Sequence, residues 1–180
     1  ALYIRRGTKI SPLFHGGYQE KSLRAGTENV PGIVGLGKTS EFAMQNMDSQ
    51  GQSLYSLRSR LEKTLQEKVP DIRINGHPKQ RLPHILNIAF QYIEGESLLL
   101  NLDMRGIYVS TGSACASGSL EPSHVVLALG VPPEMARGSI RFSLGKDNTS
   151  EDIDYTVGVI EEIVKRLRAM SPLYRDREKK

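Results

Sequence analysis

The sequence lacks tryptophan altogether and holds a single cysteine, Cys115, among its 180 residues. One cysteine cannot form a disulfide within the chain or supply the paired thiolates of a structural zinc site. No apolar stretch approaches the roughly 20 residues that a membrane-spanning helix needs, and no apolar signal segment opens the chain. These absences favour a protein of the reducing cytoplasm.

No single sign of charge dominates the sequence either. The formal net charge is +4, and charged residues make up 24% of the chain. Hydrophobic residues amount to 38%, which is enough for a packed core and argues against disorder. Basic residues cluster only at the C-terminal tail, and no recognition-helix or RNA-binding signature accompanies them. We therefore expect a solvated tail, and neither nucleic acid nor a membrane as a direct partner.

The N-terminal part of the chain is rich in glycine and does not begin with methionine. We therefore expect the chain to begin inside a longer protein or to be a processed product. Short strands are expected at residues 1–5 and 10–14. Asn29, followed by Pro31, indicates the cap and first turn of a helix. The polar stretch 45–52 contains a glycine and is expected to break or bend that helix.

From about residue 48 onward the pattern is that of a two-layer α/β domain. Apolar residues from Leu54 to Val69 recur every three or four positions, which is the period of a one-sided helix, and Pro70 ends it. Strands are expected at 71–74, 85–90, 107–110 and 139–144, and further helices at 95–105, 123–129 and 149–167.

Cys115 stands in a stretch, residues 110–119, that contains only serine, threonine, glycine and alanine besides the cysteine. Such a segment has little side chain to bury and high backbone freedom, so it would expose its cysteine. An exposed thiolate can act as a nucleophile. The alternative is that Cys115 is a small buried hydrophobic residue, and the local sequence leaves both interpretations open.

The cysteine stretch is similar to the active-site loop of the NifS/IscS-type cysteine desulfurases, which are class-V aminotransferases. The similarity runs through 110–117 and continues in Leu120-Glu121-Pro122-Ser123. Three further blocks agree in order and spacing: His15-Gly16-Gly17 with Gln19-Glu20, Arg24-Ala25-Gly26-Thr27, and Ser139-Ile140-Arg141-Phe142-Ser143-Leu144-Gly145. The long loop of small residues resembles the group that supplies sulfur for iron–sulfur cluster assembly.

This resemblance implies a homodimeric enzyme with the aspartate-aminotransferase fold, which is pyridoxal 5'-phosphate fold type I. The expected reaction removes sulfur from L-cysteine, giving L-alanine and a persulfide on Cys115 for an iron–sulfur scaffold or another acceptor protein. Residues 1–47 are expected to be the last segment of the large cofactor-binding domain. Residues 48–180 are expected to form the small C-terminal domain that carries the cysteine loop.

Two more site residues follow from the resemblance. Arg141 is expected to bind the substrate carboxylate through its guanidinium fork; from the strand pattern alone it could equally be a solvated surface residue. Thr27 is expected to contact the cofactor phosphate of the neighbouring subunit, whereas without the family it would be taken for a helix cap. A lipase-type oxyanion role for His15 is rejected, because the chain has no GxSxG motif.

The expected site is incomplete in this chain. The family's cofactor-binding lysine follows a histidine, and none of the four histidines here precedes a lysine. We therefore expect the N-terminal remainder of the enzyme to supply that lysine. The histidines show no metal-ligand spacing, so no metal is expected, apart from transient ligation of an iron–sulfur cluster by Cys115. The alternatives are a non-enzymatic sulfur-carrier or regulatory module, an aminotransferase, or a selenocysteine lyase.

Overall fold

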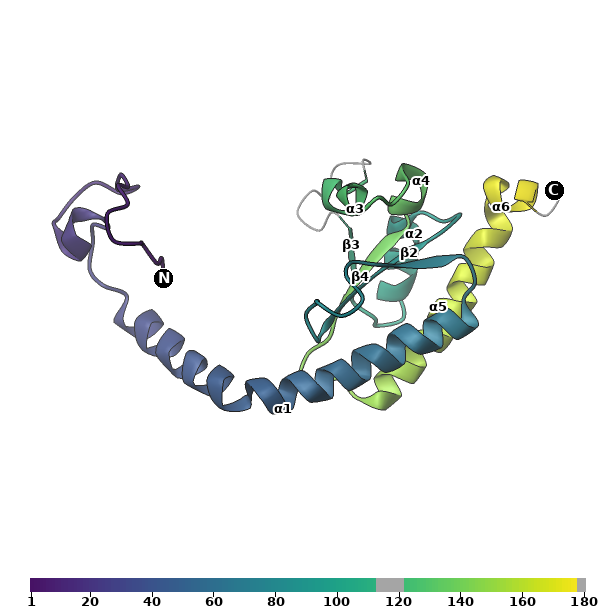
Figure 1. Cartoon of the computed structure of the whole chain (residues 1–180), viewed down its shortest axis with the longest axis horizontal. Coiled ribbons are helices and arrows are strands. Elements are labelled where there is room, and N and C mark those ends of the chain that lie inside the picture. The colour runs from purple at the N-terminus through teal and green to yellow at the C-terminus, as the bar shows by residue number, and fades with distance from the viewer. Residues whose placement is uncertain (113–121, 178–180) are drawn as a thin grey trace. The chain divides into compact units, whose positions relative to one another are not determined.

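The computed structural model describes residues 1–112 and 122–177 (Figure 1). The chain divides into two compact units, Ala1–Asn46 and Met47–Lys180. Within the described residues, no helix is both long enough and apolar enough to cross a membrane.

The first unit holds a short 3-10 helix, η1 (Gln19–Ser22), and the beginning of the long helix α1 (Val30–Lys68). The strands expected at 1–5 and 10–14 are wrong, because residues 1–18 form no strand. The apolar side chains there are largely exposed, with Leu2 at 77% and Tyr3 at 88%. A strand is stable only when a neighbouring strand pairs with it, and this unit offers no such partner among its described residues.

Helix α1 begins as its sequence predicts. The Asn29 Oδ1 atom accepts a hydrogen bond from the Gly32 backbone N–H at 3.1 Å, which caps the first turn. Of the break or bend expected near Gly51, the break is wrong, because α1 continues as one helix to Lys68. One exposed glycine weakens a helix by only about 1 kcal/mol. Buried Leu61 and Leu65 farther along supply the packing that holds α1 in place.

The second unit contains an antiparallel sheet in the order β1-β2-β4-β3. Its strands are β1 (Ile72–Asn75), β2 (Ile85–Phe90), β3 (Ser110–Thr111) and β4 (Ser139–Ser143). Strand β3 starts later than the expected 107–110. The Ile107 N–H still bonds to the Leu102 carbonyl, so the chain leaves the preceding helix only shortly before it reaches β4.

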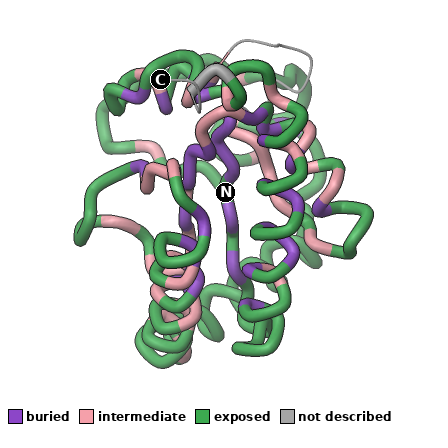
Figure 2. The backbone as a smooth tube through the Cα atoms, turned by 90° about the vertical axis from the view of Figure 1, so that its right-hand side faces the viewer, coloured by how far each residue is buried: buried purple, intermediate pink, exposed green. Residues whose placement is uncertain are grey.

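One face of the sheet carries the main core. Side chains alternate along β2 and β4, so Leu86, Ile88, Ile140 and Phe142 point into this core. It is completed by α1, by α2 (Gly95–Asp103) and by α5 (Ser150–Met170). Figure 2 marks the buried residues in purple, and they follow the strands and the helix sides that face them. This is the two-layer arrangement that the sequence predicts.

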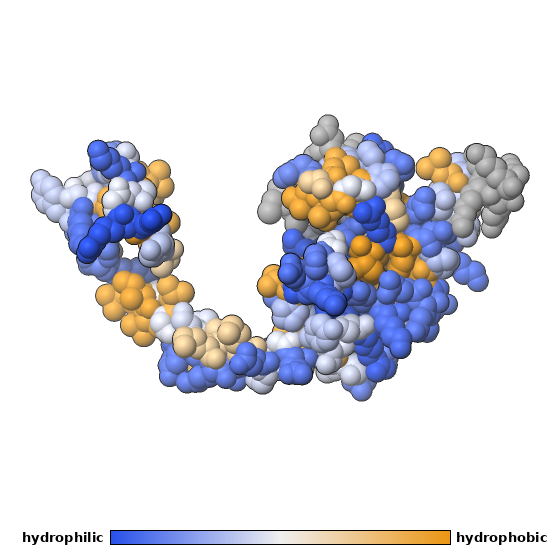
Figure 3. All heavy atoms as spheres, viewed as in Figure 1, coloured by the Kyte–Doolittle hydropathy of each residue, from blue (hydrophilic) through white to orange (hydrophobic). Residues whose placement is uncertain are grey.

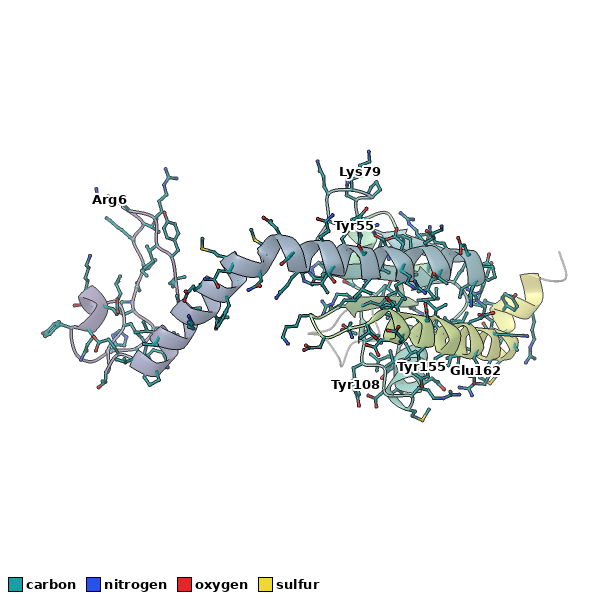
Figure 4. All side chains as sticks on the ribbon, turned by 90° about the horizontal axis from the view of Figure 1, so that it is seen from below. Arg6, Tyr55, Lys79, Tyr108, Tyr155 and Glu162 are labelled. Atoms are coloured by element: carbon teal, nitrogen blue, oxygen red, sulfur yellow. The ribbon has the colours of Figure 1, made fainter. Side chains whose placement is uncertain are left out.

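Helix α5 begins at a reciprocal cap. Thr149 accepts a hydrogen bond from the Asp152 backbone N–H, and the Asp152 carboxylate accepts one from the Thr149 N–H. Helices α1 and α5 lie side by side in Figure 4, joined by an ion pair between Arg60 and Asp154 at 2.6 Å. A final short helix, α6 (Pro172–Arg177), follows α5.

One end of the opposite face of the sheet is covered by two short helices. There lie α3 (His124–Ala128) and α4 (Pro133–Ala136), which build a second, smaller core with Ala89 of β2. Gly130 follows α3 with φ of +72°, which suits the expected glycine stop. This partly covered side is called the outer face below.

Candidate functional site

Cys115 lies outside the described residues, whereas the chain on both sides of its loop lies within them. On the leading side, β3 pairs with β4, and the Gly112 N–H donates a hydrogen bond to the Ser139 carbonyl at 3.1 Å. On the trailing side, Ser123 is buried and its carbonyl accepts the Leu127 N–H at 3.0 Å in the first turn of α3. The residues that flank the loop are thus anchored to a strand at one end and to a helix at the other.

The two ends of the loop meet each other. A Cβ atom added to Gly112 would lie 3.4 Å from the Ser139 Cβ and 3.5 Å from the Ser123 Cβ. It would also lie 3.4 Å from a methyl group of Val126 in α3. Since Ser139 opens β4, the segment that carries Cys115 leaves and re-enters the described structure at one place, the start of β4.

Arg141 lies two residues farther along β4 and is exposed. The strand register places it directly opposite Ser110 of β3 on one side and Asn87 of β2 on the other. Its side chain shares the outer face with Ser139 and Ser143, because side chains alternate along a strand. The residue that leads into the cysteine loop and the expected carboxylate-binding arginine therefore occupy one row of the sheet.

That row continues to the far edge of the sheet. Asn75 of β1 lies opposite Asn87, and its Nδ2 donates to the Asn87 Oδ1 at 2.7 Å. Asn75 is 7% exposed, so this bond fixes the Asn87 amide beside Arg141. Neither asparagine was predicted from the sequence as part of the site. The signal in the sequence was the alternation along β2, where the polar Asn87 stands between the apolar Leu86 and Ile88.

An arginine clamp holds the helices that flank this row. The Arg73 side chain of β1 donates to the carbonyls of Leu129 and Gly130 at 3.1 and 2.9 Å, at the end of α3. Helices α3 and α4 consequently stay over the Ser139 end of the outer face. Arg141, farther along β4, is left exposed.

Thr27 belongs to the first unit, where two of the sequence blocks come together. A Cβ on Gly16 would lie 3.0 Å from the Ala25 Cβ, and the Gly26 N–H donates to the Gln19 side chain at 3.3 Å. Gly26 has φ of +96°, a conformation that favours glycine. Thr27 follows this turn, is exposed, and stands just before the N-terminus of α1.

The three expected site residues are thus distributed over two units. Arg141 and both ends of the Cys115 loop belong to the second unit, and Thr27 belongs to the first. No group of three or more histidine, cysteine, aspartate or glutamate side chains within 1–112 and 122–177 is arranged to hold a metal ion.

Comparison with known proteins agrees with these motifs. The sequence matches the aminotransferase class-V family over residues 1–156. It is 60% identical over 173 residues to cysteine desulfurase IscS of Methanosarcina thermophila, covering 96% of this chain and 43% of that protein. It is 54% identical over 172 residues to cysteine desulfurase IscS of Dictyoglomus turgidum, covering 96% and 44%. The chain therefore spans under half the length of these relatives.

Solved structures give the same result for the fold. A NifS-like protein superposes with a TM-score of 0.78 at 40% identity, over 91% of this chain and 41% of that one. The NifS-like protein from Rickettsia africae superposes with a TM-score of 0.77 at 35% identity, over 88% and 41%. The expected fold, part of pyridoxal-phosphate fold type I, is confirmed. The chain belongs to the class-V aminotransferase family, and within it resembles the NifS/IscS cysteine desulfurases.

Proposed function

We propose that this chain is part of a cysteine desulfurase that transfers sulfur from L-cysteine to Cys115. One observation carries the proposal: both ends of the Cys115 loop meet at the start of β4, the strand that also presents Arg141. A nucleophile in a loop whose ends lie beside the strand of an anion-binding arginine suits a small substrate that bears both a thiol and a carboxylate. The identity to proteins named cysteine desulfurase IscS supports the same reaction.

The residues of this chain fit one part of a pyridoxal 5'-phosphate site. Thr27 offers an exposed hydroxyl after the Gly26 turn and before the N-terminus of α1, and both the hydroxyl and helix N-terminal amides suit a phosphate. When bound, the cofactor supplies an electron sink for the bonds around the substrate α-carbon. We place its lysine and the groups around its ring in the remainder of the protein.

The chemistry assigned to this chain begins with binding. The Arg141 guanidinium holds the cysteine carboxylate through two parallel N–H bonds, a geometry that lysine does not reproduce. The Cys115 thiolate then attacks the substrate sulfur. The new S–S bond forms as the C–S bond breaks, and the electron pair stays on the substrate carbon. That carbon takes up a proton, so L-cysteine and the Cys115 thiol become L-alanine and a persulfide.

The proposal extends to the assembly in which the reaction occurs. Large apolar side chains along the first half of α1 are exposed, as the orange surface there shows in Figure 3. They are Val30, Ile33, Val34, Leu36, Phe42, Met44 and Met47. Such a surface needs a covering partner. We assign residues 1–47 to the large domain, packed against the rest of the enzyme in a homodimer, and residues 48–180 to the small domain.

The persulfide on Cys115 is then passed to an acceptor protein. The loop length favours a scaffold for iron–sulfur cluster assembly, and transient ligation of the cluster by Cys115 fits that role. The lone cysteine, which has no disulfide partner in this chain, suits the reducing cytoplasm.

The test uses the complete protein, with the N-terminal remainder present, and measures alanine release from L-cysteine. We expect Cys115→Ala to abolish sulfur release while the cofactor stays bound, and mass spectrometry of the wild type to find one added sulfur atom on Cys115. Alanine and sulfide production at the wild-type rate by the variant would remove Cys115 from the reaction. A sulfur-carrier role would instead show as persulfide loading from external donors without alanine.

A second experiment tests whether the cofactor-binding lysine lies outside this chain. The isolated 180-residue chain is mixed with pyridoxal phosphate and treated with borohydride. We expect no specific lysine of this chain to be labelled. A stable adduct at one defined lysine would contradict the placement of the cofactor-binding lysine in the remainder.

A further inference from the structure

A cluster of charged side chains lies where α1 meets the segment 76–84, far in sequence from the proposed desulfurase site. Arg81 of that segment donates from its Nη2 to both oxygens of Glu62 on α1, at 2.8 and 2.5 Å. One turn earlier on α1, Arg58 brings its Nη1 to 3.7 Å from the same carboxylate. Two guanidinium groups thus share a single carboxylate.

Arg58 is buried in this cluster, and Glu62 and Arg81 are partly buried. Arg58 is 3% exposed, and the side chains of Glu62 and Arg81 are 18% and 16% exposed. The ring of Tyr55 covers Arg58, with the guanidinium carbon 4.9 Å from the ring centre. Figure 4 shows Tyr55 on the side of α1 from which the segment carrying Lys79 projects.

Among the described residues, Glu62 leaves several N–H groups of the two arginines without a hydrogen bond. The Nε and Nη1 atoms of Arg58 and the Nε and Nη1 atoms of Arg81 are buried without a hydrogen-bond partner in the described part of the chain. Arg58 Nη1 is within ion-pair distance of Glu62 but makes no hydrogen bond to it. Buried guanidinium N–H groups are stable only when acceptors face them.

The cluster also carries more positive than negative charge. Burial and the nearby Arg81 lower the pKa of Arg58, with Glu62 acting in the opposite direction. Since an arginine stays protonated even so, the cluster keeps one positive charge in excess. The segment 76–84 adds Lys79 and two histidines and contains no aspartate or glutamate. The surroundings therefore attract an anion.

We propose that Arg58 and Arg81 bind a small oxyanion, such as phosphate or sulfate, at the junction of α1 and the segment 76–84. A tetrahedral oxyanion supplies several acceptors at once and also cancels the excess charge, whereas a water molecule supplies acceptors alone. Because the four nitrogens are closed off, the ion enters as the segment 76–84 lifts from α1 and is enclosed when it returns. This site is independent of the proposed desulfurase reaction.

The test measures binding of inorganic phosphate to the 180-residue chain by calorimetry and by thermal unfolding, against sodium chloride at equal ionic strength. We expect saturable binding, a raised Tm, and slower hydrogen exchange of the amides in 76–84. Arg81→Met should weaken phosphate binding by at least about tenfold. Arg60→Met is the matched control, because Arg60 is on the same helix but forms an exposed ion pair with Asp154.

Glu62→Gln keeps the proposal testable if Arg81→Met does not fold. Removing the one carboxylate removes its repulsion of the anion, so phosphate binding should tighten by about tenfold or more. Equal binding by the wild type, Arg81→Met and Arg60→Met would mean adsorption elsewhere on the surface. That result, no binding by the wild type, or weaker binding by Glu62→Gln would each overturn the proposal.

Discussion

Gly138 immediately precedes β4, and replacing it by alanine tests whether the base of the cysteine loop is as tightly packed as the structure indicates. A Cβ at this position would overlap the backbone carbonyl oxygen of Phe90 and would lie 2.9 Å from that of Ile93. Both contacts are with backbone atoms, which cannot rotate away as a side chain can. The Phe90 N–H also donates to the Gly138 carbonyl at 3.0 Å, so the two segments cannot separate without losing that bond.

The expected loss follows from the two effects together. Overpacking of this kind destabilises by typically about 1–3 kcal/mol, and breaking the backbone bond adds about 1 kcal/mol. We therefore expect Gly138→Ala to lower the free energy of unfolding by about 2–4 kcal/mol. For a chain of this size the corresponding fall in Tm is roughly 4–16 °C. Urea unfolding followed by circular dichroism measures the first quantity, and a thermal scan measures the second.

Gly158→Ala provides the matched control. Gly158 lies in the middle of α5 and is exposed, and a Cβ there meets nothing within 4 Å. Alanine is the better helix former, so this variant should gain about 0.5–1 kcal/mol. The reasoning would be refuted if Gly138→Ala unfolded within about 0.5 kcal/mol of the wild type while Gly158→Ala behaved as expected.

Two further predictions concern single charged residues. In the complete enzyme, Arg141→Lys should raise the KM for cysteine by about ten- to a hundredfold, because one of two charge-assisted bonds is lost; unchanged kinetics would remove Arg141 from the site. The hydrogen bond from Arg60 lowers the pKa of the Asp154 carboxyl. Its stabilising effect is therefore present above the ordinary aspartate pKa and is lost as the pH falls through the lowered value. Wild type and Asp154→Asn should differ in stability at neutral pH and converge in strong acid, and a constant difference down to pH ~2 would contradict this.

The helices and strands that could be predicted from the sequence are those whose own residues determine their structure. Strands β2 and β4 show the alternation that their burial requires, and α5 carries its cap in Thr149 and Asp152. Helices α4 and α6 were not predicted from the sequence. The strands expected at 1–5 and 10–14 are wrong because strand formation depends on a partner, which a local pattern does not contain.

The site divides in the same way. Cys115, Thr27 and Arg141 are predicted from their motifs, and their roles stay predictions. Asn75 and Asn87 could not be assigned, because their position beside Arg141 depends on the register of three strands. Arg58 and Arg81 were missed for a related reason: they are 23 residues apart, and only the folded chain brings both to Glu62.

Strand β4 gives one physical reason why the base of the cysteine loop and Arg141, the proposed carboxylate-binding residue, would move as one unit. Gly138 permits the close backbone approach to Phe90, which fixes where the strand begins. Ser139 then receives the Gly112 N–H and so fixes the base of the loop. Arg141 follows two residues later, on the same face and in the same rigid ladder. A shift of this strand would therefore move the loop base and the arginine together, so their separation is preserved even where their absolute positions change.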